Sequence, residues 1–93
     1  MPDTAEVSLL ESVRSVVCRP EFTWDCQWAL DTTLCESSWR ANAQGIEGSL
    51  AFNGLWQVWN GPFDPYLNTV EAHVQYVEWQ EGVRVNDPWP NCP

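Results

Sequence analysis

The chain has 93 residues, which corresponds to a single domain over positions 1–93. Its formal net charge is −9, and its four basic residues are all arginines. Nucleic acids and anionic membranes both require a basic surface, so neither is expected as a partner. A chain this short buries little core, but its seven tryptophans and four cysteines are two sources of added stability.

The first predicted element is a helix over residues 4–17. Thr4 is a plausible N-cap, and Pro20 is placed to end the element. Apolar residues recur at helical spacing along it: Val7, Leu10, Val13 and Val17. A loop over residues 18–26 follows.

A second helix is predicted from a cap at Asp25 or Thr23 to about Ser38. Its apolar stripe is expected to contain Trp28, Ala29, Thr32 and Cys35. Glu36 follows Thr32 by one helical turn, so it is expected beside this stripe, near the end of the helix.

The four cysteines favour disulfides and an oxidising compartment. Zinc is the alternative, but no two cysteines have the close spacing of a zinc site. Cys26 and Cys35 are nine positions apart on the predicted helix, roughly 13 Å, which is beyond the reach of a disulfide. Two connectivities remain: Cys18–Cys26 with Cys35–Cys92, or Cys18–Cys35 with Cys26–Cys92. We favour the first because Cys18 and Cys26 flank one short loop.

Residues 40–63 are rich in turn formers and are predicted to be irregular. A last helix is predicted from Asp64-Pro65 to about Glu81, with Gly82 as its C-cap. Its apolar side is expected to contain Leu67, Val70, Val74, Val77 and either Ala72 or Trp79. The tail from residue 83 is expected to wrap back through Cys92. The predicted fold is therefore mainly α, with three principal helices, an irregular loop and disulfide staples.

Glu36 is the first candidate for chemistry. A glutamate at a helix C-terminus is unfavourable for the helix dipole, and apolar or aromatic neighbours such as Trp39 raise the pKa of a carboxyl. A raised pKa is what a general acid needs near neutral pH. The alternative is a solvated glutamate at a frayed helix end, and helix position alone does not decide between them.

Ordered motifs favour the catalytic alternative. Residues 29–43 resemble the first motif of the soluble lytic transglycosylase and goose-type lysozyme superfamily, in which a helix ends in Glu-Ser and an Asn-Ala pair follows. Residues 53–58, Asn-Gly-Leu-Trp-Gln-Val, resemble its second motif, and residues 64–72 resemble its later Asp-Pro…Asn…Ala helix start. Trp89 and Cys92 resemble the ending of short versions related to resuscitation-promoting factors. Larger members carry an Ala-Tyr-Asn motif that this chain lacks, which implies a shortened, more open cleft.

The resemblance implies a lysozyme-like domain that cleaves the β-1,4 bond between N-acetylmuramic acid and N-acetylglucosamine in peptidoglycan, with Glu36 as the general acid. In lytic transglycosylases the same residue then acts as base, and the 6-hydroxyl of the muramic acid attacks. A hydrolase instead uses a second carboxylate to position water. Glu47 and Asp64 are the candidates, although neither matches a motif. Transglycosylase chemistry, or hydrolysis without a strongly bound base, is therefore favoured.

Five residues are candidates for substrate binding: Ser37, Asn53, Gln57, Trp59 and Tyr76. Ser37 and Gln57 match motif positions, and Asn53 is expected at the turn beside Gln57. Ser37 could instead donate to the carbonyl four residues earlier. Since a domain this small needs most of its tryptophans in the core, Trp59 alone is expected to be exposed. His73 has no visible acidic or metal partner and is expected at or near the surface.

The expected partners are peptidoglycan glycan strands, with chitin oligomers as a further substrate, and the chain is expected to act as a monomer without cofactor or metal. No stretch of the sequence reads as a signal peptide or a membrane span. The expected location is extracellular, periplasmic or in the cell wall, or alternatively that of a phage lysis or virion protein. The competing function is a carbohydrate-binding module that keeps the fold without catalysis.

Overall fold

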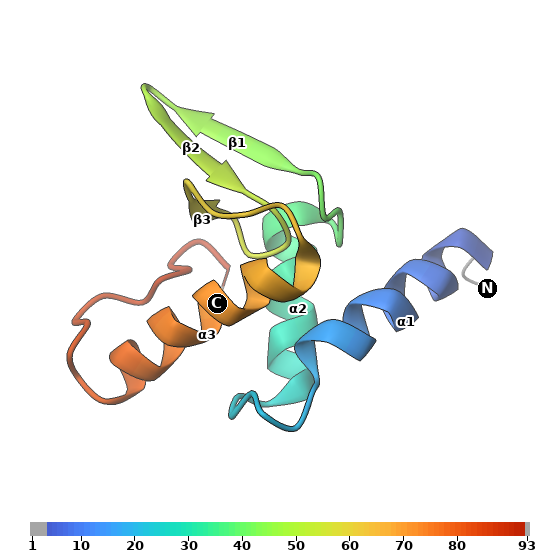
Figure 1. The fold of residues 1–93 in the computed structure, drawn as a ribbon, viewed down its shortest axis with the longest axis horizontal. Helices are drawn as coiled ribbons and strands as arrows, with labels where there is room; N and C mark the ends of the chain where they lie inside the picture. The colour runs from blue at the N-terminus through green and yellow to red at the C-terminus, as the bar shows by residue number, and fades with distance from the viewer. Residues whose placement is uncertain (1–3, 93) are drawn as a thin grey trace.

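The computed structural model describes residues 4–92, which form helices and a small sheet (Figure 1). The helices are α1 (Thr4–Val17), α2 (Cys26–Ser37) and α3 (Pro65–Gln80), and the strands are β1 (Gln44–Glu47), β2 (Leu50–Asn53) and β3 (Val58–Trp59). All three predicted helices are confirmed. Helix α1 contacts both other helices and projects to one side of the body, and the tail returns from the end of α3 towards α2 and the sheet. None of the helices in residues 4–92 has the length and apolarity needed to cross a bilayer.

The prediction of an irregular segment over residues 40–63 is wrong. This segment contains a three-stranded antiparallel sheet in the order β1-β2-β3. Some of its turn formers, such as Gly48 and Gly54, lie outside the strands, whereas Gly45 and Asn53 lie within β1 and β2. The first hairpin has a two-residue connection, with Glu47 paired with Leu50. In the register, Phe52 lies opposite both Gly45 and Trp59, so these three residues share one face of the sheet.

An aromatic cluster forms much of the core. Trp24, Trp56 and Trp89 are buried, with ring centroids 4.5 Å apart for Trp24–Trp56 and 5.0 Å apart for Trp56–Trp89. The Trp89 indole also donates a hydrogen bond of 3.0 Å to the carbonyl of Trp56. The tail is therefore anchored in the core, as its predicted return through Cys92 requires.

The predicted apolar side of α3 is wrong in part. Leu67 and Val74 are each 52% exposed, whereas the buried residues of the helix are Asn68, Thr69 and Ala72. The inward face is partly polar because it meets hydrogen-bonding groups. The indole N–H of Trp56, for example, donates to the Thr69 hydroxyl at 3.2 Å.

The fully buried Asn68 joins α3 to the segment that carries the sheet. Its Oδ1 accepts from the backbone N–H of Trp56 at 2.9 Å, and its Nδ2 donates to the carbonyls of Asn53 and Pro62 at 2.8 and 2.9 Å. Gly54 lies directly against this amide with a φ of 82°, and a Cβ there would come within 2.5 Å of Asn68 Nδ2. A side chain at position 54 is therefore excluded by both backbone conformation and space.

Both favoured disulfides are confirmed: Cys18–Cys26 and Cys35–Cys92. Since these bonds engage all four cysteines, the zinc alternative is excluded. Asp25 is confirmed as the N-cap of α2, because its carboxylate accepts from the backbone N–H of Trp28 at 2.9 Å.

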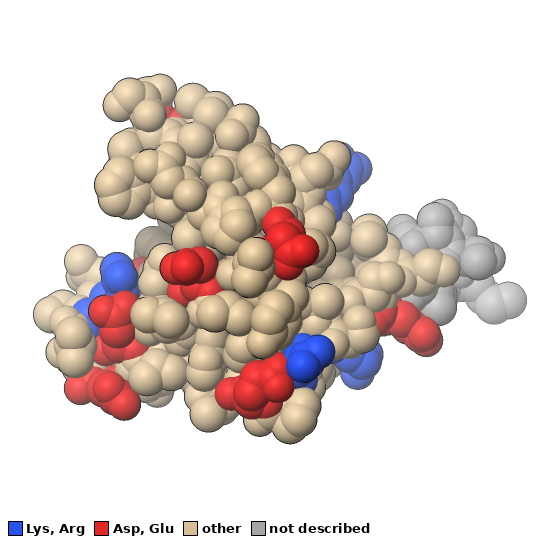
Figure 2. Space-filling view, in the orientation of Figure 1, with Lys and Arg blue, Asp and Glu red and all other residues tan. Residues whose placement is uncertain are grey.

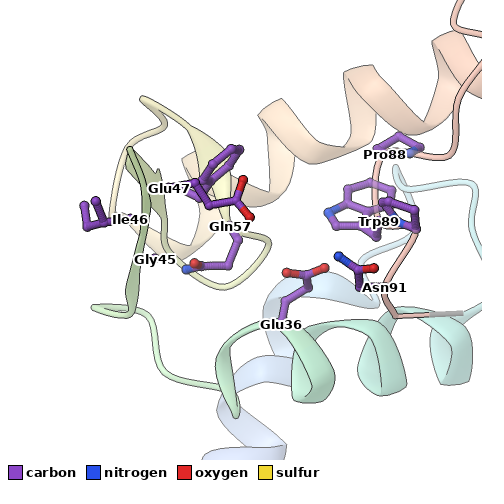
Figure 3. A pocket seen from close by; sticks show the side chains of 10 residues that line it. Glu36, Gly45, Ile46, Glu47, Gln57, Pro88, Trp89 and Asn91 are labelled. Atoms are coloured by element: carbon purple, nitrogen blue, oxygen red, sulfur yellow. The ribbon is translucent and has the colours of Figure 1, made fainter. Parts of the chain in front are cut away.

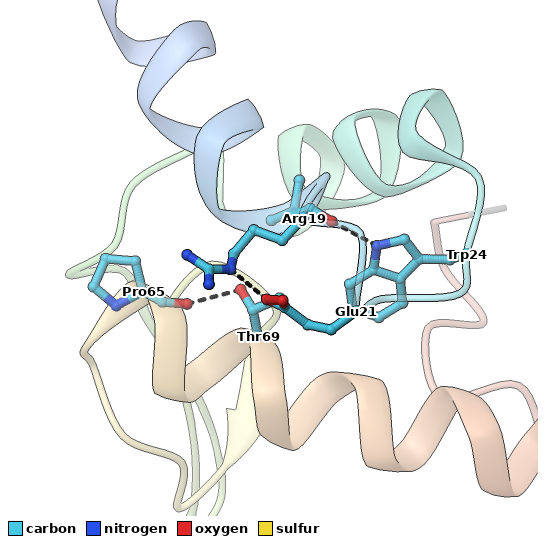
Figure 4. A network of polar contacts seen from close by, with 6 residues as sticks. Arg19, Glu21, Trp24, Pro65 and Thr69 are labelled. Atoms are coloured by element: carbon cyan, nitrogen blue, oxygen red, sulfur yellow. Dashed lines mark hydrogen bonds and ion pairs between the residues drawn. The ribbon is translucent and has the colours of Figure 1, made fainter.

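The loop between α1 and α2 is fixed by polar contacts as well as by its disulfide. The Trp24 indole donates to the carbonyl of Val17 at 2.7 Å, and Arg19 pairs with Glu21 on the outside of the loop (Figure 4). The backbone N–H of Thr23 donates to Nε2 of the half-buried His73, and burial lowers the pKa of this histidine. His73 therefore has a structural partner in the loop.

We predict that Asn68→Leu, which keeps the number and branching of the non-hydrogen side-chain atoms, destabilises the fold by about 3 kcal/mol, because three hydrogen-bonding groups lose a buried partner. The midpoint of thermal unfolding should fall by at least about 10 °C. Asn86→Leu, at an exposed position in the tail, is the matched control and should unfold close to the wild type. Equal midpoints for the two variants would contradict the role of Asn68.

Candidate active site

Glu36 lies in the last turn of α2, which is held on both sides. The preceding residue, Cys35, is bonded to Cys92, with their Cα atoms 5.8 Å apart. The following residue, Ser37, is buried, and its hydroxyl donates to the carbonyl of Thr33 at 3.0 Å. These contacts fix the end of the helix, and with it the direction in which Glu36 projects.

Glu36 projects into a cavity of about 470 Å³ (Figure 3). Three segments form its walls: the end of α2, the sheet with the turn after β2, and the tail. The lining residues are Glu36, Gly45, Ile46, Glu47, Phe52, Gln57, Pro88, Trp89, Pro90 and Asn91. The cavity thus brings Glu36 of the first motif and Gln57 of the second to one place.

The environment of Glu36 favours its protonated form. The side chain is half-buried, and burial raises the pKa of the carboxyl. Its place at the C-terminal end of a helix acts in the same direction, because the backbone carbonyls there present partial negative charge. A carboxyl group whose pKa is raised and which faces a cavity is suited to protonating an oxygen atom of a bound molecule.

Gln57 is fixed opposite Glu36 by its own amide. Its Nε2 donates to the carbonyls of Ala43 and Gly54 at 3.1 and 2.9 Å, and its backbone has a φ of 51°. Its Oε1 lies against Gly45 of β1, where a Cβ would come within 2.8 Å of it. The amide is therefore held against the sheet at the wall of the cavity.

The sheet contributes one wall and an apolar surface beside it. Phe52 lines the cavity, and Trp59 lies opposite it on the neighbouring strand, so both side chains are on the cavity face of the sheet. Trp59 is 59% exposed, which confirms that it is an exposed tryptophan. A flat aromatic ring at this position is suited to stacking on a sugar, and its role in binding stays a prediction.

Besides Trp59, three further predicted binding residues lie outside the cavity lining. Ser37 is buried and makes the hydrogen bond of its alternative structural role. Asn53 is buried, accepts from Gln44 and donates to the carbonyl of Gly61, so it fixes the sheet. Tyr76 packs in the aromatic cluster, 5.2 Å from the ring of Trp28.

The structure gives different roles to the two candidates for a second carboxylate, Asp64 and Glu47. Asp64 caps α3, and its carboxylate accepts from the backbone N–H of Leu67 at 2.9 Å. Glu47 lines the cavity from β1, and Figure 3 shows its carboxylate turned towards the interior. No cluster of three metal-binding side chains occurs among residues 4–92.

The tail supplies a wall that the motifs did not predict, formed by residues 88–91. Trp89 was identified only as part of a motif, and Asn91 was not identified at all. The signal was present in the favoured pairing of Cys35 with Cys92. A bond between these cysteines places their neighbours, Glu36 and Asn91, near each other.

Charge is distributed unevenly between the sheet and the helices. Residues 41–63 contain a single charged side chain, Glu47. On the face shown in Figure 2, acidic side chains gather over the helical part, and the sheet is nearly free of charge. The acidic surface of the chain is therefore concentrated away from the sheet wall of the cavity.

Comparison of the chain with known protein families, with curated proteins and with solved structures found no match.

We predict that Glu36→Gln stabilises the fold at neutral pH. A raised pKa means that ionisation of Glu36 costs stability. The protonated carboxyl makes its full contribution to stability below the ordinary glutamate range, and this contribution is lost as pH rises through the raised pKa. The variant should therefore unfold a few degrees above the wild type at pH 7, and the difference should shrink towards pH 4 in thermal unfolding. Glu71→Gln removes an exposed carboxylate from α3 and controls for net charge. A difference independent of pH, or equal to that of the control, would refute the prediction.

Proposed function

We propose that the protein cleaves the glycan strands of peptidoglycan at the β-1,4 bond between N-acetylmuramic acid and N-acetylglucosamine, with Glu36 as the general acid. The observation that carries this proposal is a half-buried carboxyl of raised pKa, held rigidly at a helix end and facing a cavity. A glycosidic oxygen is a poor leaving group until it is protonated, and this carboxyl is placed to supply the proton.

The arrangement of the motif residues supports the same reaction. Glu36 and Gln57 come from the two motifs that resemble the lytic transglycosylase superfamily, and they meet in one cavity. Asn68 and Ala72, from the third resembling segment, are both buried in α3, where Asn68 fixes the turn that carries Gln57. Each motif thus has a physical part in forming one site.

In the proposed reaction, the Glu36 proton passes to the glycosidic oxygen as the bond from the anomeric carbon breaks. The carboxylate left behind then accepts a proton from the nucleophile that attacks this carbon. If the 6-hydroxyl of the muramic acid attacks, the product has a 1,6-anhydro end; if water attacks, it has a reducing end. Since Asp64 is engaged as a helix cap, Glu47 is the remaining candidate for positioning water.

A second candidate function is glycan binding without catalysis. The exposed Trp59 beside Phe52 favours it, because an aromatic surface next to a cavity can bind sugar rings whether or not a bond is cut. In either function the two disulfides favour an oxidising compartment, such as the cell exterior or the periplasm. A phage lysis or virion protein is the alternative location.

We predict that Glu36→Gln lowers the cleavage of purified cell walls at least about 100-fold, because the amide cannot supply the proton. Loss of turbidity is the measurement, and Glu71→Gln should keep wild-type activity. Wild-type activity should fall as pH rises through the raised pKa of Glu36. If Glu36→Gln cleaves as well as the wild type, Glu36 is not the acid; if the wild type binds walls without cleaving them, the binding function replaces the enzymatic one.

We also predict 1,6-anhydro product ends, together with less than about tenfold loss of activity in Glu47→Gln, because the substrate's own hydroxyl needs no second carboxylate. Mass spectrometry distinguishes anhydro from reducing ends by one water. Reducing ends in the wild type, with a loss above about 100-fold in Glu47→Gln, would instead make Glu47 the base of a hydrolase.

A further inference from the structure

The tail forms a rigid wall of the cavity directly beside the acid. Trp89 is buried and donates its indole N–H to Trp56, its backbone N–H donates to Asp87 Oδ1 at 2.8 Å, and its carbonyl accepts from the backbone N–H of Cys92. The disulfide to Cys35 then closes the wall onto the end of α2. The position of this wall is therefore fixed by both packing and a covalent bond.

Asn91 presents its side chain from this wall. The backbone carbonyl oxygen of Asn91 lies 3.7 Å from Cys35 Sγ, so the backbone of this residue is close to the last turn of α2. The side chain is exposed and lines the cavity, into which Asn91 and Glu36 project from the tail and from α2 (Figure 3). Within residues 4–92, the hydrogen bonds of the tail leave the Asn91 carboxamide unengaged.

We propose that Asn91 is a specificity-determining residue that binds the 2-acetamido group of the sugar held against Glu36. The proposal rests on the proposed function, since it assigns one contact of the same glycan. A carboxamide offers one donor and one acceptor side, which matches the carbonyl and N–H of an acetamido group.

The neighbours of Asn91 favour this group over the other polar groups of a glycan. Pro88, Trp89 and Pro90 line the same wall and give it an apolar surface on which the acetamido methyl group can lie. A hydroxyl has no methyl group to bury there. A free amine would be held by a carboxylate, and the tail wall contributes none to the cavity.

The test compares two neutral β-1,4 tetrasaccharides, chitotetraose and cellotetraose, which differ in the acetamido groups. Neutral sugars are needed because the net charge of −9 would attract a cationic deacetylated oligomer regardless of Asn91. Binding is measured by calorimetry in the Glu36→Gln background, in which the sugars are not cut. Asn91→Ala is compared with Asn86→Ala, an exposed tail asparagine outside the cavity lining.

We predict that Asn91→Ala weakens chitotetraose binding about tenfold, as the loss of a hydrogen-bonded group implies, and leaves cellotetraose binding unchanged. Asn86→Ala should change neither. Equal losses for both sugars, or no loss for either, would overturn the assignment of Asn91 while leaving the proposed function standing. If the parent protein binds neither sugar and does not bind cell walls, the proposed function and the role of Asn91 both fall.

Discussion

The three hydrogen bonds of the buried Asn68 amide are the constraint on which the site depends. The sheet contains only short strands and has no core of its own, so its position is set by attachment to α3. Asn68 supplies that attachment at the turn leading to Gln57, and Gly54 is required because no side chain fits against the amide. Without this contact, the cavity wall opposite Glu36 would not have a defined place.

The helices were predictable because each has local signals that act without the rest of the fold. Asp25 and Asp64 both cap the helices predicted to follow them. The strands were missed because each is at most four residues long and lies among turn formers. A strand this short contains too few positions to show the alternation of apolar and polar residues by which strands are predicted. The inner face of α3 was missed because Asn68 and Thr69 are satisfied by partners that only the tertiary structure supplies.

The site was predictable where a motif or a covalent link constrained it. Glu36 and Gln57 follow from motif resemblance, and the cavity joins them. Ser37 and Asn53 carry motif-like positions too, but their polar groups are used within the protein, a choice that sequence spacing does not encode. Asn91 comes near Glu36 through a pairing of residues far apart in the chain, so local pattern could not identify it.

The Cys35–Cys92 disulfide couples assembly of the site to the redox state of the chain. It closes a loop between residues 57 positions apart. In the chain-entropy account, this lowers the conformational entropy of the unfolded chain and stabilises the fold by about 4 kcal/mol. The same bond fixes the tail wall beside Glu36. A freshly synthesised chain with reduced thiols therefore lacks both the added stability and the covalent closure of the cavity, and a cell that makes it in a reducing cytosol holds an incomplete site until oxidation.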